Sequence, residues 1–323
     1  MSRMKNGVPF SGPVRIPREA ETEAIRKAPA YDREAARAYI PVMPELRELI
    51  DKVRDEEGLA AFGKKSPSRE TMDRVEKEIR ALCAGGHKVS LILADLATCS
   101  GAAYCSGIPM CTQSTVKAIY VGALLESRPE VLSESGAYLR DAIVLSSNEA
   151  YENLREIYGK EPILRWCHEA GVDPSFADSP YPRNKNARDM LKLWMRLYCF
   201  LNGDRDQQNF GAYYADSLAS ATKERLGRKY PVQTKAGWEC GLDEEEDYDP
   251  AAVIPDRFRD GDPENDECAI NDTGIVYTGS GPYLFVIYTD HPYGIFRNGA
   301  TPNPLYPLVD ALADLQADLA RCS

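Results

Sequence analysis

The order of helical and strand-like segments constrains the fold of this 323-residue chain most strongly. Residues 114–226 are predicted to be helix after helix, because apolar residues recur there at spacings of three and four. β-Branched and aliphatic runs lie on either side of this block, within 88–105 and 232–289. Neither side has enough strands for a sheet of its own. The sequence therefore predicts an α/β fold of the α+β kind, in which both ends share one antiparallel sheet flanked by helices, beside an all-helical lobe.

Periodicity and end signals place the individual elements. Ser68 is a helix N-cap, Pro162 suits a first helical turn, and four glycines that follow periodic runs suit helix ends: Gly159, Gly171, Gly203 and Gly227. Helices are expected at 33–56 (broken at Pro41 and Pro44), 69–83, from 114 onward, and at 134–145, 148–158, 162–170, 185–201, 212–226 and 305–320. Strands are expected at 88–96, 102–105, 232–238, 274–277 and 283–289, with loops at 63–68 and 241–268.

The same pattern predicts the domain organisation. Residues 1–67 are expected to be a partly helical N-terminal extension, and residues 68–323 one domain. The α/β part of that domain takes in 68–113 and 228–323, and the helical lobe spans 114–227. A site is expected in the cleft between these two parts.

Charge and hydropathy exclude several kinds of partner. The formal net charge of −11 argues against nucleic acid or an anionic membrane surface. No apolar run approaches the ~20 residues that a membrane-spanning helix needs. Residues 1–28 lack the apolar stretch of a secretory signal. We therefore expect a cytoplasmic protein, or one whose export segment is missing from this chain.

Cysteine and histidine spacing gives no sign of a metal or another cofactor. The nine cysteines contain no C-x-x-C pair, and the three histidines (His87, His168 and His291) have neither H-x-x-x-H nor H-x-H spacing. We expect neither a metal nor a cofactor. Cys240 and Cys268 bracket the acidic loop, and are either a disulfide in an oxidising compartment or two free thiols.

The first chemical motif is Ser114-Thr115-Val116-Lys117. A serine that opens a helix and a lysine three residues later share one helix face. A lysine whose pKa is depressed by burial can take the hydroxyl proton and make the serine a nucleophile. The alternative is a solvated helix start, since the same S-x-x-K spacing also occurs at Ser2 and Ser220.

Two further motifs follow. In Ser146-Ser147-Asn148, on a turn between predicted helices, a hydroxyl could relay a proton and an amide could hold a substrate carbonyl; the alternative is a plain N-cap. In the strand segment Lys235-Ala236-Gly237-Trp238, the lysine could bind a carboxylate and lower the pKa of Lys117. There Gly237 allows close approach of substrate, and the N–H of Trp238 could form an oxyanion hole with that of Ser114. The alternative is an edge-strand lysine beside a turn glycine.

The three motifs in this order resemble the class A β-lactamase and penicillin-binding-protein family of serine hydrolases. The resemblance covers roughly residues 68–320. It implies that Ser114 is acylated, that Lys117 is its base, and that Ser146 relays the proton. It further implies that Asn148 positions the substrate and Lys235 binds its carboxylate. A β-lactam or a D-alanyl peptide is then the expected small-molecule or peptide substrate, and an extracytoplasmic location the expected one.

Departures from the family pattern bear on turnover. Ser147 replaces an aspartate, Ala236 replaces a hydroxyl residue, and only 32 positions separate Ser114 from Ser146. The family's deacylating glutamate lies on an Ω-shaped loop, and the corresponding stretch here, 173–186, has only Asp173 and Asp178 as acids. The Glu149–Asn153 segment fits the Glu-x-x-x-Asn pattern but follows Ser146 directly. We therefore expect an acyl-enzyme with slow deacylation. The alternative is a peptidase-like or non-catalytic protein with the same fold.

Overall fold

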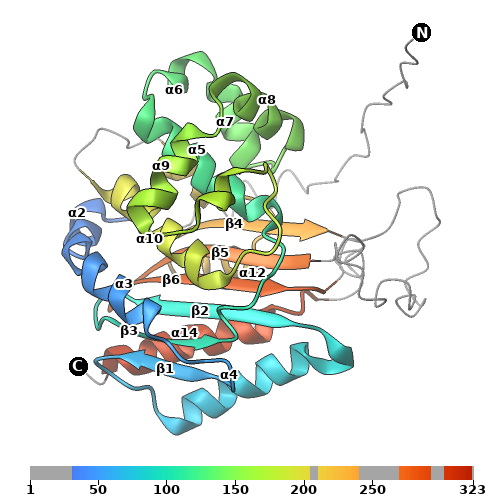
Figure 1. Cartoon of the computed structure of the whole chain (residues 1–323). Helices are drawn as coiled ribbons and strands as arrows, with labels where there is room; N and C mark the ends of the chain where they lie inside the picture. The colour runs from blue at the N-terminus through green and yellow to red at the C-terminus, as the bar shows by residue number, and fades with distance from the viewer. Residues whose placement is uncertain (1–30, 204–209, 240–268, 292–301, 322–323) are drawn as a thin grey trace.

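The computed structural model describes residues 31–203, 210–239, 269–291 and 302–321 (Figure 1). Their strands form one six-stranded antiparallel sheet in the order β1-β3-β2-β6-β5-β4. The strands are β1 Ala60–Gly63, β2 Val89–Asp95, β3 Ser100–Tyr104, β4 Val232–Glu239, β5 Ala269–Thr278 and β6 Gly281–Thr289. The pairing of β2 with β6, with Ile92 opposite Val286, joins the two ends of the chain. The predicted shared sheet is therefore confirmed.

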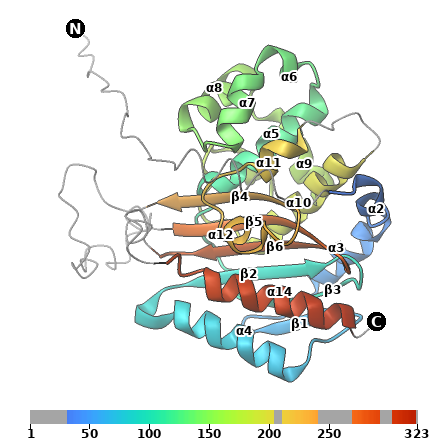
Figure 2. The same cartoon turned by 180° about the vertical axis from the view of Figure 1, so that it is seen from behind.

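Helices cover both faces of this sheet. Before the helical lobe come α2 Arg33–Arg37, α3 Met43–Asp51 and α4 Arg69–Leu82. The lobe and the helices after it are α5 Val116–Ser127, α6 Val131–Glu134, α7 Gly136–Ile143, α8 Asn148–Tyr158, α9 Glu161–Ala170, α10 Ala187–Asn202, α11 Gly211–Ala215, α12 Ala221–Leu226 and α14 Tyr306–Arg321. Figure 1 shows α5 to α9 gathered beyond the β4 edge of the sheet, and Figure 2 shows α4 and α14 against the other face.

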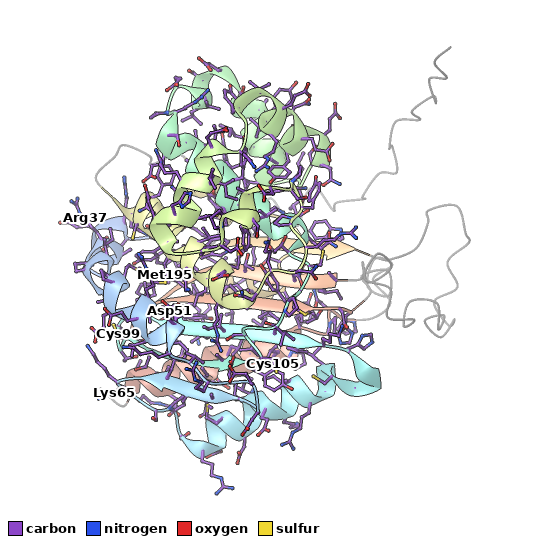
Figure 3. All side chains as sticks on the ribbon, in the orientation of Figure 1. Arg37, Asp51, Lys65, Cys99, Cys105 and Met195 are labelled. Atoms are coloured by element: carbon purple, nitrogen blue, oxygen red, sulfur yellow. The ribbon has the colours of Figure 1, made fainter. Side chains whose placement is uncertain are left out.

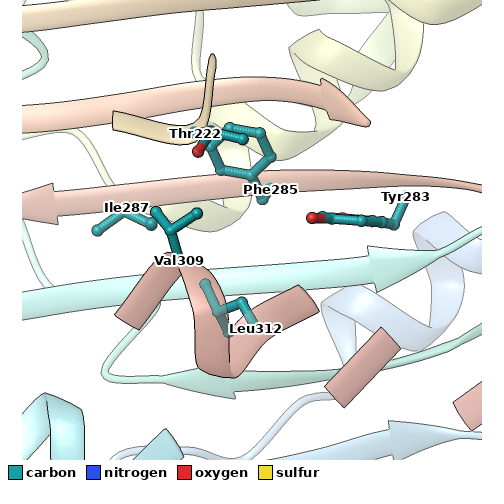
Figure 4. A pocket seen from close by; sticks show the side chains of 6 residues that line it. All are labelled: Thr222, Tyr283, Phe285, Ile287, Val309 and Leu312. Carbon is teal, nitrogen blue, oxygen red and sulfur yellow. The ribbon is translucent and has the colours of Figure 1, made fainter. Parts of the chain in front are cut away.

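The two faces carry separate apolar cores because side chains alternate along each strand. Ile92, Leu284 and Val286 point toward α10 and the helical lobe. Their neighbours Leu93 and Phe285 point toward α4, α12 and α14. The pocket in Figure 4 lies in this second core, and is lined by Thr222, Tyr283, Phe285, Ile287, Val309 and Leu312.

Most predicted helix ends are confirmed. The Ser68 hydroxyl accepts from Thr71 N at 3.3 Å and so caps α4. Gly171 ends α9 in the left-handed conformation at φ 66°. Gly203 and Gly227 follow their helices with negative φ, so they are not left-handed caps.

Several predictions of secondary structure were wrong in detail. The break predicted at Pro44 is absent, because Pro44 lies in the first turn of α3. The helix predicted at 212–226 is two helices, because Ser220 starts α12 afresh by accepting from Lys223 N. This capping also accounts for the second S-x-x-K match. The helix predicted at 134–145 starts after a break at Ser135. Strand β1 was not predicted; its four residues pair with β3, Phe62 lying opposite Gly101.

The described part of the N-terminal extension packs on the rest of the chain. Helices α2 and α3 contact α10, and β1 forms an edge of the sheet. Lys192 of α10 and Asp51 of α3 form an ion pair at 2.5 Å. Figure 3 labels Asp51 and, on α10, Met195. The domain boundary at residue 67 stays a prediction.

Some predictions lie outside the described residues. These are the leader up to residue 30, the acidic loop 241–268, and the Cys240–Cys268 disulfide. Within the described ranges, no helix has both the length and the apolar character to span a bilayer.

Candidate active site

Ser114 lies in a 3-10 turn, Gln113–Thr115, that leads directly into α5. The edge strand β4 passes very close to this turn. A Cβ built on Gly237 would lie only 2.9 Å from Ser114 N. The glycine at this position is therefore required for the approach of β4 to the backbone of Ser114. The predicted role of Gly237, close approach of substrate, stays a prediction.

Lys117, in the first turn of α5, is fully buried and tied to the second motif. Its Nζ donates to Ser146 O and to Asn148 Oδ1, both at 2.6 Å. Burial lowers the pKa of Lys117 to about 7, an effect that the charge of Glu152 partly opposes. Lys117 therefore has the depressed pKa that a lysine base needs.

The lysine's hydrogen bonds do not reach the serine. In the described part of the chain, Lys117 Nζ bonds Ser146 and Asn148 and makes no hydrogen bond to Ser114. Catalytic hydrogen bonds often tighten only when substrate is present. Ser114 and Lys117 thus lie within one helical turn of each other, but no hydrogen bond connects their side chains in the described structure.

Ser146 connects the two lysines. Its backbone has φ 58°, a left-handed conformation that is uncommon for a residue other than glycine. Its carbonyl oxygen accepts from Lys117, while its hydroxyl accepts from Lys235 Nζ at 2.8 Å. The next residue, Ser147, caps α8 by accepting from Ala150 N at 3.1 Å. The capping interpretation of this motif therefore holds for Ser147, while the site roles of Ser146 and Asn148 stay predictions.

Lys235 is fully buried on β4, on the face of the sheet that carries Thr273 and Val286. Besides Ser146, its Nζ donates to Ala236 O at 3.0 Å and lies 5.7 Å from the ring centre of Trp238. Burial lowers the pKa of Lys235 well below its usual value, and the nearby charge of Lys117 adds to this effect. The hydroxyl and the carbonyl of one serine thus each bond a buried amine, and the charge of Lys117 disfavours the protonation of Lys235.

The acids at the expected Ω-loop position are engaged elsewhere. Asp173 accepts from Ser175 N at 2.8 Å and caps a short 3-10 helix, Pro174–Ala177. Asp178 pairs with Lys160 at 2.6 Å. Neither is hydrogen bonded to the group around Lys117. The stretch 173–186 therefore brings no carboxylate to the site among its described contacts.

Sequence analysis missed two residues beside Lys117. The ring of Tyr181 lies 5.6 Å from Lys117 Nζ, and its hydroxyl donates to Glu152 Oε1 at 3.3 Å. Glu152 belongs to α8, four residues after Asn148. That i, i+4 spacing was a signal available in the sequence.

The structure also brings together two histidines that are distant in sequence. His87 and His291 stack with ring centres 3.9 Å apart, and His87 Nδ1 lies 3.2 Å from Asp290 Oδ1. Within the described ranges, no group of three histidine, cysteine or acidic residues is arranged to hold a metal ion.

Known proteins resemble this chain in sequence family and in fold. The model of the β-lactamase enzyme family matches residues 134–306, just over half of the chain, and this region includes Ser146, Asn148 and Lys235. No curated protein sequence matches the chain.

Several solved β-lactamase structures share the fold. The enzyme from Streptosporangium roseum is 20% identical, with a TM-score of 0.51 over 77% of this chain and 98% of its own. The one from Chitinophaga pinensis is 14% identical, with a TM-score of 0.55 over 76% of this chain and 99% of its own. The one from Xanthomonas campestris is 14% identical, with a TM-score of 0.54 over 75% and 97%.

Family match, shared fold and converging motifs agree with one another. The chain belongs to the β-lactamase enzyme family and is a serine hydrolase of the β-lactamase type.

Proposed function

We propose that this protein forms an acyl-enzyme on Ser114 with a β-lactam, or with a related amide or ester that bears a carboxylate. The observation that carries the proposal is the hydrogen-bonded chain from Lys117 through Ser146 to Lys235. It links all three motifs, which come from separate parts of the sequence. The match to the β-lactamase family supports a β-lactam as the substrate class.

In the acylation step, neutral Lys117 takes the Ser114 proton as Oγ attacks the carbonyl carbon. The new bond is Oγ–C, and the tetrahedral oxyanion is stabilised by the backbone N–H groups of Ser114 and Trp238. The C–N or C–O bond of the substrate then breaks. The proton that Lys117 took passes to the leaving atom by way of the Ser146 hydroxyl, which Lys235 orients at 2.8 Å. A pKa near 7 keeps a large share of Lys117 in the neutral form at neutral pH.

Substrate binding is proposed for Asn148 and Lys235. The Asn148 side chain is held by Lys117, with its amide nitrogen left to donate to a substrate carbonyl. Lys235 donates to the Ser146 hydroxyl, and a substrate carboxylate placed next to that hydroxyl favours the protonated, charged form of the buried lysine. Ala236 offers no hydroxyl of its own, which removes one expected contact. Carboxylate recognition therefore depends more heavily on Lys235.

Slow deacylation is the second half of the proposal. Asp173 and Asp178 hold a helix cap and a surface ion pair instead of a water molecule. The same observation favours the alternative, a peptidase-like protein that acts on D-alanyl peptides. A non-catalytic role is less well supported, because the buried lysine pair is costly to maintain without a use for it.

Intact-protein mass spectrometry tests the proposal. After incubation with a penicillin, or with a fluorophosphonate as a general serine probe, the wild-type protein should gain the mass of one adduct. Ser114→Ala should gain none while remaining folded by circular dichroism. A folded wild-type protein without adduct from either probe would support the non-catalytic alternative. A D-alanyl ester tested in parallel separates peptidase-like from β-lactamase activity.

A further inference from the structure

We propose that Glu152, in α8, is the general base that activates water for release of the acyl group from Ser114. This inference rests on the proposed function. It assigns to a helix the carboxylate that sequence analysis sought in residues 173–186. The assignment stands on the position of Glu152 relative to Lys117 and Tyr181.

Helix geometry places Glu152 beside the acylating group. Asn148 and Glu152 are four residues apart on α8 and therefore share one face of the helix. Asn148 Oδ1 accepts from Lys117 at 2.6 Å, which fixes that face toward the site. Glu152 is exposed, so water can reach its carboxylate. Among the described residues, it is the one carboxylate whose charge acts on the Lys117 pKa.

Tyr181 makes a second contact that fixes the Glu152 carboxylate. Its hydroxyl donates to Glu152 Oε1 at 3.3 Å, which leaves Oε2 to accept from a water molecule. Tyr181 is itself positioned by Tyr151, whose hydroxyl donates to Pro180 O at 2.9 Å and whose ring packs edge-on at 5.6 Å. The loop thus supplies an orienting hydroxyl, and the helix supplies the base.

Other acids on the same helix are less suitably placed. Glu149 is one residue from Asn148, about 100° around the helix. Glu156 is one further turn away from Asn148 than Glu152. Both are exposed, and neither acts on Lys117. Glu156 is therefore a matched control for Glu152.

The chemical step balances without any further reagent. The water oxygen attacks the acyl carbon and forms a C–O bond, and Glu152 takes the water proton. The tetrahedral intermediate then breaks its bond to Ser114 Oγ. Glu152 passes the water proton to Lys117, and Lys117 passes it to the oxygen of Ser114, so that both groups return to their starting protonation states. A carboxylic acid leaves, and the serine is restored.

The test measures the lifetime of the acyl-enzyme. Wild type, Glu152→Gln and Glu156→Gln are loaded with a penicillin, freed of excess ligand, and followed by intact mass from about pH 5 to about pH 9. We expect Glu152→Gln to prolong the lifetime roughly 10²-fold, with acylation changed less than about twofold. The acid limb of the deacylation pH profile should disappear in this variant only. Glu152→Asp, which keeps a carboxylate, should recover part of the rate.

The outcomes separate this inference from the proposed function. If wild type forms no adduct, the proposed function fails and this inference fails with it. If wild type forms an adduct that Glu152→Gln releases at the same rate, only this inference is overturned. Equal slowing of acylation and deacylation, or an unchanged pH profile, would assign Glu152 a structural role and would also overturn it. Should Glu152→Gln not fold, the Glu152→Asp profile decides.

Discussion

The lysines proposed to act in the acylation of Ser114 and the glutamate proposed to release the acyl group are held in different ways. Lys117 and Lys235 are fully buried, and each bonds a backbone carbonyl as well as a side chain. Glu152 is exposed, and one hydroxyl at 3.3 Å holds it. Burial changes the pKa of both lysines, whereas the exposed carboxylate stays close to bulk water.

On the proposed mechanism, this difference favours acylation of Ser114 over release of the acyl group. A base is most effective when its pKa is near the working pH, and burial brings Lys117 there. Glu152 is exposed, and a single hydroxyl orients it. The site is therefore expected to acylate readily and deacylate slowly. The following substitutions test the two sides, from the largest expected effect to the smallest.

Removing the buried base should have the largest effect. Lys117→Ala should slow acylation by a penicillin about 10³-fold, within the range of general-base contributions. The measurement is a rapid-quench time course read by intact mass, and Lys77→Ala, a surface lysine of α4, is the control. Acylation of Lys117→Ala at the wild-type rate would show that another group activates Ser114.

The free energy of unfolding should depend on Asp272, which lies on the face of the sheet opposite to that of Lys235. This carboxylate is buried on β5, accepts from Thr222 N and Ser220 Oγ, and has one oxygen without a partner. Burial raises its pKa to about 6 from 3.8. Its folded-state pKa exceeds its unfolded one, so its contribution is fully present below about pH 4 and is lost as the pH rises through about 6.

Asp272→Asn should therefore stabilise the protein at about pH 8 by up to about 3 kcal/mol and should change little at about pH 4. Urea unfolding of both proteins at the two pH values measures this difference. An equal difference at both values would contradict the assignment. This buried charge contrasts with the two lysines, because it lies on the opposite face of the sheet and has no part in the proposed chemistry.

Removing the Lys235 side chain should affect substrates with a carboxylate more than neutral substrates. Lys235→Ala should lower kcat/KM for carboxylate-bearing substrates roughly 10-fold more than for neutral esters, as expected for one charged hydrogen bond. Steady-state assays on a matched pair of esters, with and without the carboxylate, test this. An equal loss on both substrates would assign Lys235 only to positioning Ser146.

The smallest effect is expected for Tyr181→Phe. Without its hydroxyl, Glu152 loses one orienting hydrogen bond, and a neutral-to-charged bond of this kind is worth about 1.5 kcal/mol or less at an exposed site. Release of the acyl group should slow several-fold, with acylation unchanged. The acyl-enzyme decay provides the measurement, and Tyr138→Phe, on the exposed surface of α7, is the control. A slowed acylation step would place Tyr181 on the Lys117 side of the site.

Sequence patterns predicted the shared sheet and the three motifs that the structure brings together, because both rest on local signals. The strands at 89–95 and 281–289 have β-branched runs, and three short motifs mark Ser114, Ser146 and Lys235. Strand β1 was missed because four residues, Ala-Ala-Phe-Gly, have little strand propensity and depend on pairing with β3.

The deacylating side was harder to predict because it depends on contacts between segments. The left-handed backbone of Ser146 and the bond from Tyr181 to Glu152 are tertiary features. No sequence periodicity indicates that Tyr181, a loop residue 29 positions after Glu152, contacts the Glu152 carboxylate. The contact between Tyr181 and Glu152 therefore could not be predicted from the sequence.

The pH dependence of acylation tests the central claim, that neutral Lys117 activates Ser114, most directly. The rate constant for adduct formation on wild type is measured by rapid quench and intact mass from about pH 5 to about pH 9. We predict a rise with its midpoint near pH 7, the pKa to which burial lowers Lys117, and a plateau above it. A rate that is independent of pH, or one that still climbs at the highest pH toward the ordinary lysine pKa of 10.5, would contradict this assignment.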